Sequence, residues 1–349
     1  MGTLDRAEHD RPRATLASVA ALAQVSPQTV SNVLNAPHLV RADTTARVRE
    51  AIDELGYRPL AAARQMRTRR SRIIGLRLEP LRDGINGVVL DRFLHALTEE
   101  AQSGGYRVML FTAHDDADEI AQYGELLVTT SIDGFVLTGT HHDDPRTTWL
   151  TERAVPFVAF GRPWSDDPRA ARGHSWVDVD GASGTRAATE HLLAEGHRRV
   201  GYLGWPAGKG VADDRRRGWR EAVDQHLGDL RAAADAWEIR SEDGVAAGIS
   251  GARALLGRPN PPTALVCASD SLAIGAAAAG GGLTVIGFDD TPAAAAMGIS
   301  SVAQPLVEAA RNCFALLHER LDAPDGAPPP TAQRLLAPDL VLRAGTPPA

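Results

Sequence analysis

The sequence contains little cysteine and no long apolar segment. Only Cys267 and Cys313 occur among 349 residues, too few for a disulfide framework in a chain this long, so both are expected to be buried free thiols. No run of about 18 or more apolar residues could form a transmembrane helix. Residues 1–13 are charged and lack an apolar stretch, so we expect a disordered tail rather than a secretory signal. Together these absences predict a cytoplasmic protein.

Catalytic and cofactor motifs are also missing. The glycine-rich GYLGWPAGKG has Leu203 where a phosphate-binding loop requires glycine, and Gly210 replaces the required Ser or Thr. No G-x-G-x-x-G opens a helix after the first strand, and no serine nucleophile elbow occurs. His141–Asp144 offers metal-ligand side chains, but adjacent residues cannot all face one ion, which favours a solvated loop. We therefore predict no catalytic activity, no cofactor and no metal site.

Positive charge is scarce overall but concentrated at one end. The net charge of −7 alone argues against nucleic-acid binding. Residues 1–72, however, hold 12 arginines and seven acidic residues, a net charge of +5, so the remainder carries −12. This distribution predicts that the basic N-terminal segment contacts nucleic-acid phosphates and that the acidic remainder of the chain is a separate module that does not.

Two short helices are predicted within this basic segment. Thr15 and Ser26 are suitable N-caps, and Pro27 suits a first helical position. Val30 and Val33 then mark one apolar face. Joined by a turn of about four residues, such helices form a helix-turn-helix whose second helix can enter the major groove. A helical hairpin inside a core is the alternative.

Polar residues on the second helix favour the DNA-binding interpretation. Gln28, Ser31, Asn32 and Asn35 point away from the apolar face. Gln and Asn present a donor and an acceptor side by side and can pair bidentately with adenine, whereas Ser can serve either role. A third helix follows in DTTARVREAIDELGY, and the arginine-rich PLAAARQMRTRRSR is expected to be a hinge that folds only when docked.

From Ile73 onward, strands alternate with helical segments, which is typical of doubly wound parallel sheets. The alternation restarts at SWVDVD, so we predict two lobes with a cleft beyond the carboxyl ends of their strands. The predicted fold class is a small all-α helix-turn-helix headpiece joined to an α/β two-lobed body of two doubly wound parallel sheets. RLLAPDLVLRAG is interpreted as a closing strand.

These segments resemble the lactose-repressor (LacI) family. The headpiece carries ATLASVAALAQVSPQTVSNVLN and LVRADTTARVREAIDELGYRPLAAARQMRT, and the body carries DVDGASGTRAATEHLLAEGHRRVGYLG, RRRGW, ASDSLAIG and VIGFDD, similar to a periplasmic-binding-protein-like domain. The resemblance covers residues 14 to about 345. It implies a homodimer on a near-palindromic DNA operator, hinge helices in the minor groove, and a small-molecule effector in the cleft.

Domain boundaries follow from the pattern and the resemblance together. We expect a disordered tail at 1–13, the headpiece at 14–58, a hinge helix and linker at 59–71, and an effector-binding and dimerisation domain at 72–345. Lobe 1 is expected to span about 72–172 plus 304–332, and lobe 2 about 173–303 plus 333–345.

The resemblance also implies which headpiece residues contact DNA. Base reading falls to Pro27, Gln28 and Asn32, and backbone or positioning contacts to Thr15, Ser26, Ser31 and Asn35. Asn32 replaces the family's usual Arg, so a shifted operator preference is expected. Met66 stands where a Leu is usually wedged between base pairs, a role that apolar, flexible Met can fill. Arg41 replaces the Ser that usually caps the third helix and leaves Asp43 to interact with the helix dipole.

In the cleft, the implied effector-binding residues are Arg162, Trp164, Trp205, Arg215, Ser269 and Asp289. A guanidinium and a carboxylate suit hydrogen bonds to vicinal hydroxyls, and an indole face can stack on a sugar ring. Arg215 as a surface helix charge, and the two tryptophans as lobe-packing residues, remain alternatives. Ser269 replaces a common Asn, and Gly161-Arg162 replaces a common Asp-Arg pair.

The residues and the resemblance together predict a DNA-binding transcriptional repressor of carbohydrate-utilisation genes, controlled by a mono- or oligosaccharide. One alternative is a relative that uses a nucleobase or a phosphorylated metabolite as corepressor. A second is a sugar-binding transport protein, against which the basic headpiece and the missing secretory signal argue.

Overall fold

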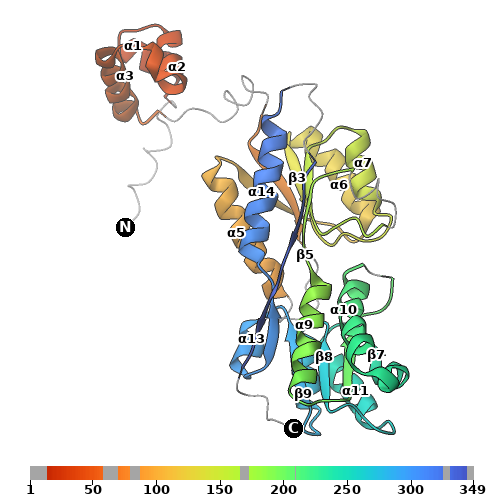
Figure 1. Ribbon diagram of the computed structural model, residues 1–349. Coiled ribbons are helices and arrows are strands. Elements are labelled where there is room, and N and C mark those ends of the chain that lie inside the picture. The colour runs from red at the N-terminus through yellow and green to blue at the C-terminus, as the bar shows by residue number, and fades with distance from the viewer. Residues whose placement is uncertain are drawn as a thin grey trace, which may run out of the picture. The chain divides into compact units, whose positions relative to one another are not determined.

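The computed structural model describes residues 14–57, 70–78, 87–165, 173–208, 210–324 and 331–343. The chain divides after Ser71 into two compact units (Figure 1). The first unit contains, in chain order, α1 (Leu16–Leu22), α2 (Pro27–Asn35), the 3₁₀ turn η1 (Pro37–Leu39) and α3 (Ala42–Leu55).

The headpiece helices begin where their sequence predicts. Thr15 accepts a hydrogen bond from the Ser18 amide, and Ser26 accepts one from the Thr29 amide, so both N-caps are confirmed. Gly56 ends α3 with φ +60°, in the left-handed region that favours glycine. Arg41 precedes α3 without a side-chain cap, as its replacement of Ser implied.

A small apolar core holds the three helices together. It is formed by Val19, Ala20, Ala23, Val30, Val33, Val48, Ala51 and Tyr57. The valines of α2 recur at helical spacing and fill this core, which gives a helix too short to be stable alone its tertiary support.

The second unit has two lobes, each built on a six-stranded sheet. In lobe 1 all neighbouring strands are parallel, in the order β11 (Gln333–Leu336), β5 (Trp176–Val179), β4 (Phe157–Phe160), β3 (Gly134–Leu137), β1 (Ile73–Leu78) and β2 (Arg107–Thr112). One apolar cluster joins the sheet to α5 (Gly87–Ser103) and α14 (Leu306–Asp322). A second cluster joins its other face to α6 (Asp116–Thr129) and α7 (Pro145–Glu152). The sheet is therefore covered on both faces, as predicted.

Lobe 2 repeats this architecture with one reversed strand. Its order is β12 (Asp339–Val341), β10 (Ser300–Ala303), β9 (Thr284–Phe288), β8 (Ala264–Cys267), β6 (Val200–Gly204) and β7 (Glu238–Arg240), and only the β10–β12 pairing is antiparallel. The helical segments are α9 (Gly181–Ala194), α10 (Gly210–His226), η2 (Gly228–Trp237), α11 (Val245–Leu256), α12 (Asp270–Ala278) and α13 (Pro292–Ala296).

The lobe boundaries differ from those expected. The sequence predicts 173–303 and 333–345 in lobe 2, but β5 and β11 pair with each other in the lobe 1 sheet. The chain therefore crosses into lobe 2 only after β5, returns before α14, and crosses again between β11 and β12 (Figure 1). A short buried parallel strand has the same apolar pattern in either sheet, so the sequence could not assign β5 to its partner.

Candidate functional site

The turn between α1 and α2 brings the second helix of the motif onto the first. Gln24 adopts φ +54° in this turn, a left-handed conformation uncommon for a non-glycine residue. The Val25 amide bonds to the carbonyl of Ala20 and closes the turn. The helix-turn-helix geometry is thus set by the backbone, with Val30 and Val33 turned inward and the opposite side of α2 facing solvent.

The solvent side of α2 carries the polar residues singled out from the sequence. Gln28 and Asn35 are exposed, whereas Ser31 and Asn32 are half-buried. The Gln28 side-chain amide donates to Asn32 Oδ1 at 3.1 Å, one helical turn away. Asn35 Nδ2 donates to the Ser31 carbonyl at 2.7 Å. The amide side chains of Gln28 and Asn32 therefore form one contiguous hydrogen-bonding surface along the helix. The predicted wedge residue Met66 lies outside the described residues.

A cavity of about 180 Å³ lies between the two lobes of the body. Lobe 1 contributes residues that follow β3 and β4, and lobe 2 contributes the start of α10 and the end of β9. Of the residues predicted for the cleft, Trp164 and Arg215 line this cavity. The position beyond the carboxyl ends of parallel strands agrees with the predicted location of a ligand site.

Arg215 forms the lobe 2 wall of the cavity. It is only 6% exposed, so it is not the surface helix charge that was considered as an alternative. Its guanidinium lies 3.6 Å from the Phe288 ring centroid, donates to the Ala268 carbonyl, and has Nη1 3.5 Å from Asp289 Oδ1. Its Nε is buried and makes no hydrogen bond.

Asp289 supports Arg215 from behind the cavity rather than lining it. It accepts a hydrogen bond from Gln304 Nε2 at 2.6 Å. Burial raises the pKa of its carboxyl to about 7. Arg215 opposes this rise, and the like charge of Asp270 adds to it. The side chain can therefore exist as acid or carboxylate near neutral pH.

Trp205 and Ser269 also stand behind the cavity lining. The Trp205 indole donates to Asp243 Oδ1 at 3.0 Å and lies 4.9 Å from the Arg215 guanidinium. The Ser269 hydroxyl donates to the same Asp243 oxygen at 2.5 Å and caps α12. Ser269 is not among the residues that line the cavity, so the structure does not bring it there as a contact residue.

Arg162 connects the two lobes directly. Its Nε donates to Asp178 at 2.6 Å within lobe 1, and its Nη2 donates to Asp214 of α10 at 3.2 Å. Burial raises the pKa of Asp178, and the Arg162 charge opposes this rise. Asp178 and Asp214 were missed from the sequence. Asp178 could have been singled out because it is the one acidic residue in the apolar strand WVDV. Asp214 gave no such signal, because it lies among other charged residues in DDRRR.

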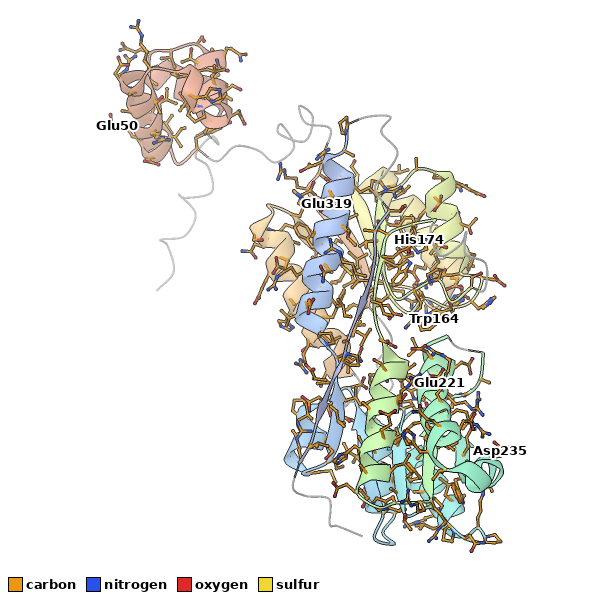
Figure 2. All side chains as sticks on the ribbon, in the orientation of Figure 1. Glu50, Trp164, His174, Glu221, Asp235 and Glu319 are labelled. Carbon is orange, nitrogen blue, oxygen red and sulfur yellow. The ribbon has the colours of Figure 1, made fainter. Side chains whose placement is uncertain are left out.

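Trp164 crosses from lobe 1 to lobe 2. It adopts φ +52° and lies at the edge of lobe 1 that faces lobe 2 (Figure 2). Its indole packs so closely against Gly210 that a Cβ on this glycine would lie 2.1 Å from the ring. Its Nε1 is buried without a hydrogen-bond partner, and its ring stacks on Arg162. Trp164 thus both packs the lobes together, the alternative considered, and faces the cavity.

The HHDD segment is more structured than the solvated loop we expected. Asp144 is buried, and with His141 and Asp116 it places possible ligand atoms within 4.8 Å of one another. The guanidinium of Arg146, itself buried, contacts Asp144 at 2.6 Å and Asp116 at 3.5 Å. A cation of the chain therefore already neutralises these carboxylates.

Comparisons with known proteins agree with this architecture. Residues 15–59 match the bacterial regulatory proteins of the lacI family, and residues 189–346 match a periplasmic binding protein-like domain. The HTH-type transcriptional regulator CelR of Thermobifida fusca is 32% identical over 330 residues, covering 89% of this chain and 93% of its own. No helix in the described ranges has the length and apolar composition to cross a membrane.

Two solved structures are similar over most of the body or the whole chain. A regulatory protein of the LacI family from Chloroflexus aggregans is 34% identical, with a TM-score of 0.69, covering 79% of this chain and 99% of its own. A CelR–cellobiose complex is 28% identical, with a TM-score of 0.66, covering 96% of this chain and all of its own (100%). The chain therefore belongs to the LacI family of bacterial regulatory proteins and is a DNA-binding transcriptional regulator with a small-molecule effector domain.

Proposed function

We propose that the protein represses carbohydrate-utilisation genes and that a sugar in the interlobe cavity controls its affinity for the operator. One observation carries the sugar assignment. Arg215 Nε and Trp164 Nε1 are buried donors without acceptors, and both residues line the same cavity. A ligand that supplies oxygen acceptors removes the cost of leaving them unpaired.

The chemistry around these donors suits a neutral polyol. Arg215, held by Asp289 behind it, offers donors, and the Trp164 indole offers an apolar face for a sugar ring. The cavity of about 180 Å³ shares Trp164 and Asp214 with an adjoining interlobe cavity of about 470 Å³, and together they offer room for a mono- or oligosaccharide. A relative solved with cellobiose supports the sugar class.

The proposed DNA contacts lie at the start of α1, on α2 and in the hinge. Gln28, Asn32 and Pro27 would read base edges, with Thr15, Ser26, Ser31 and Asn35 as positioning contacts. Met66 would act as the minor-groove wedge. Two copies of the chain would bind the two halves of a near-palindromic operator, because one recognition helix spans only one half-site.

A thermal-shift screen followed by operator titration tests this proposal. Monosaccharides and cellobiose are expected to raise the unfolding temperature, whereas adenine, guanine and glucose 6-phosphate are not. A stabilising sugar must then change operator affinity, since a ligand shifts an equilibrium only by its differential affinity for the two states. Stabilisation by a purine or a sugar phosphate alone would replace the sugar assignment with a corepressor of that class.

A further inference from the structure

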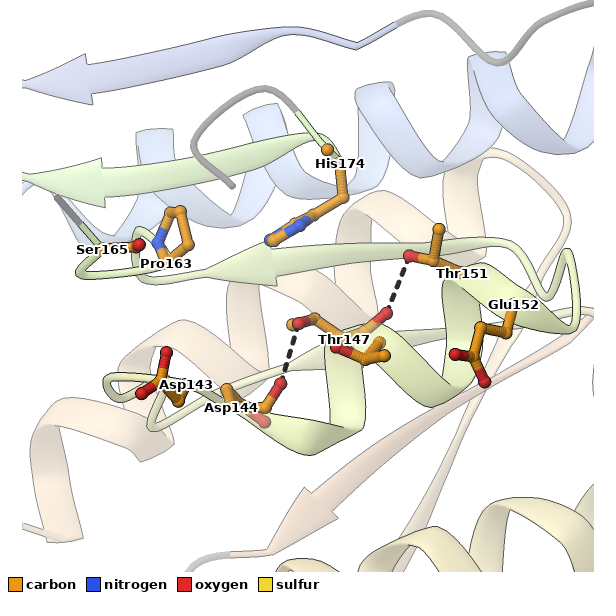
Figure 3. A pocket seen from close by; sticks show the side chains of 10 residues that line it. Asp143, Asp144, Thr147, Thr151, Glu152, Pro163, Ser165 and His174 are labelled. Carbon is orange, nitrogen blue, oxygen red and sulfur yellow. Dashed lines mark hydrogen bonds between the residues drawn. The ribbon is translucent and has the colours of Figure 1, made fainter. Parts of the chain in front are cut away.

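Lobe 1 contains another cavity, which shares no lining residue with the 180 Å³ interlobe cavity. It shares Pro163 and Ser165 with a further cavity of about 470 Å³ that lies between Trp164 and α10. The lobe 1 cavity measures about 380 Å³ and lies between α7 and the residues flanking β4 and β5, including Pro163, Ser165 and His174 (Figure 3). This volume falls within the range of roughly 300–1,000 Å³ for small-molecule sites. We call it the His174 pocket.

An unsatisfied imidazole faces this pocket. His174 is 4% exposed, and its Nε2 is buried without a hydrogen-bond partner. Its ring extends from the segment before β5 toward α7 and packs against Phe157 at a centroid distance of 5.1 Å. Burial lowers the pKa of His174 to about 4, so the ring is neutral near pH 7. A buried nitrogen left unpaired costs free energy, which a hydrogen-bonding ligand would recover.

The opposite wall presents hydroxyl oxygens. The hydroxyls of Thr147 and Thr151 donate to the carbonyls of Asp144 and Thr147, at 2.9 and 2.7 Å, as the dashed lines in Figure 3 show. With their hydrogens used inside the helix, both oxygens keep lone pairs for a ligand hydroxyl. The wall therefore accepts hydrogen bonds and calls for a ligand with several O–H donors.

Charge excludes an anionic ligand and does not demand a cationic one. The described residues that line the pocket include no Lys or Arg, so they offer no counter-charge to phosphate or carboxylate groups. Two of its carboxylates have cationic partners in the chain: Asp144 pairs with Arg146 at 2.6 Å, and Glu152 lies 3.7 Å from Arg153. The third, Asp143, is exposed to solvent and lies 3.2 Å from His142. The buried group left to bind a ligand, His174, is neutral.

We propose that the His174 pocket is an accessory binding site for a small neutral polyhydroxy compound, separate from the interlobe effector site. His174 Nε2 and the α7 hydroxyls would hold its hydroxyl groups, and Pro163 would contact its carbon skeleton. Pro163 and Ser165 flank Trp164 in the chain. Occupancy would therefore fix the loop that carries the interlobe indole.

The test follows the imidazole resonances of His174 by NMR in the full chain, assigned with His174→Leu, during titration with ribose, glucose or cellobiose. We expect one of these sugars to shift the resonances saturably. Thr151→Val should weaken this binding about three- to tenfold, since it removes one hydrogen bond. Thr98→Val is the matched control, because its hydroxyl makes the same i−4 bond, at 2.8 Å, on α5 away from the pocket. It should leave the affinity unchanged.

A background variant separates this pocket from the cleft. Asp289→Asn should leave the His174 titration intact while impairing the operator response, so the two proposals can fail independently. Five results would overturn the accessory site: no response to any sugar, equal affinity in Thr151→Val and Thr98→Val, loss of the shift in Asp289→Asn, a response to putrescine alone, or an accessory binding step that persists in His174→Leu. His174→Leu removes an unpaired nitrogen and should not lower the unfolding temperature. Calorimetry of this variant should show that the accessory step is lost and the interlobe step is kept.

Discussion

The recognition helix and the interlobe cleft use polar side chains in opposite ways. On α2, Gln28 is exposed and bonds to Asn32 on its own helix, whereas Arg215 and Asp289 are buried and paired across elements. Solvated polar groups can be exchanged with little loss of stability. Buried charges cost free energy to desolvate and more to leave unpaired. DNA reading should therefore be separable from folding, whereas effector binding should be coupled to it.

The largest expected effect comes from breaking the buried pair. Arg215→Ala leaves Asp289 without its cation and should lower the free energy of unfolding by ~3–5 kcal/mol, less near pH 6, where Asp289 can protonate. Effector affinity should also fall, about ten- to hundredfold, as donors to the ligand are lost. Urea unfolding and calorimetric titration measure the two effects.

The matched control is Arg217→Ala, on the same helix but half-exposed. It should cost about 1 kcal/mol or less, because the guanidinium is half solvated and its buried partner Asp214 keeps Arg162 at 3.2 Å. Operator affinity without ligand should survive in both variants. If Arg215→Ala proves no more destabilising than Arg217→Ala, the contrast between buried and exposed polar groups fails for this chain.

The next effect is a pH dependence confined to the cleft. The pKa of Asp289 is about 7 in the folded chain against 3.8 for the ordinary carboxyl. Between these values the folded state binds the extra proton, so the unfolding free energy should fall as pH rises from about 4 to about 7, by at most about 1.4 kcal/mol per pH unit. Burial is the main cause of the raised pKa; Arg215 lowers the pKa, and Asp270 and Asp243 raise it further.

Effector affinity should follow the opposite direction, because the ionised Asp289 carboxylate pairs with the Arg215 guanidinium and so holds the donor that lines the cavity. Affinity should rise between about pH 6 and pH 8. Asp289→Asn should flatten both profiles, and a profile unchanged in this variant would assign the titration to another group. Gln28→Ala, in the headpiece, should leave both profiles as in the wild type.

The sequence could predict those parts of the two sites that depend on neighbouring residues. It could not predict the parts that depend on pairs of residues far apart in the chain. Ser26 and Pro27 fix the start of α2 from adjacent residues, so the headpiece could be predicted in detail. The partnership of Arg162 with Asp214 spans 52 positions and joins the two lobes, and no local pattern encodes it. Ser269 shows the same limit, because the residue that diverts its hydroxyl, Asp243, belongs to another loop.

A steric change in the cleft tests whether closure depends on Trp164. Gly210→Ala places a methyl group where the indole lies, so one lobe must shift, at a cost of ~1–3 kcal/mol for overpacking. Effector affinity should fall about tenfold. Gly124→Ala, where no atom lies within 4 Å of the added Cβ, is the control and should leave affinity unchanged. Equal affinities would show that Trp164 moves freely.

In the headpiece, Gln28→Ala should lower specific operator affinity by ~1–3 kcal/mol, as for one bidentate base contact. The unfolding free energy should change by no more than about 0.5 kcal/mol. Binding to random DNA, measured in parallel, should be nearly unaffected. An equal loss of affinity on operator and random DNA would mean that Gln28 contacts phosphates rather than bases. A randomised-site selection with Asn32→Arg would show whether Asn32 also reads bases.

The smallest effect concerns Arg41, where stability and DNA binding should oppose each other. Arg41 has the extended backbone of an N-cap, with φ −62° and ψ 147°, but its side chain makes no capping bond. In Arg41→Ser the hydroxyl can accept from an amide in the first turn of α3 and should stabilise that turn by ~1 kcal/mol. The same change removes an exposed positive charge, so the slope of log affinity against log salt should fall by about 1 if Arg41 contacts a phosphate.

Arg41→Ala separates the two effects, because it removes the charge without supplying a cap. Hydrogen exchange of the α3 first-turn amides in the full chain should slow in the Ser variant and not in the Ala variant. The salt slope should fall equally in both. Identical exchange in the two variants would mean that the cap does not form, and an unchanged slope would mean that Arg41 faces away from DNA. Either result would mean that the side chain at position 41 does not by itself determine how the start of α3 behaves. The conclusion that exposed polar residues can be exchanged freely would then hold for α2 only.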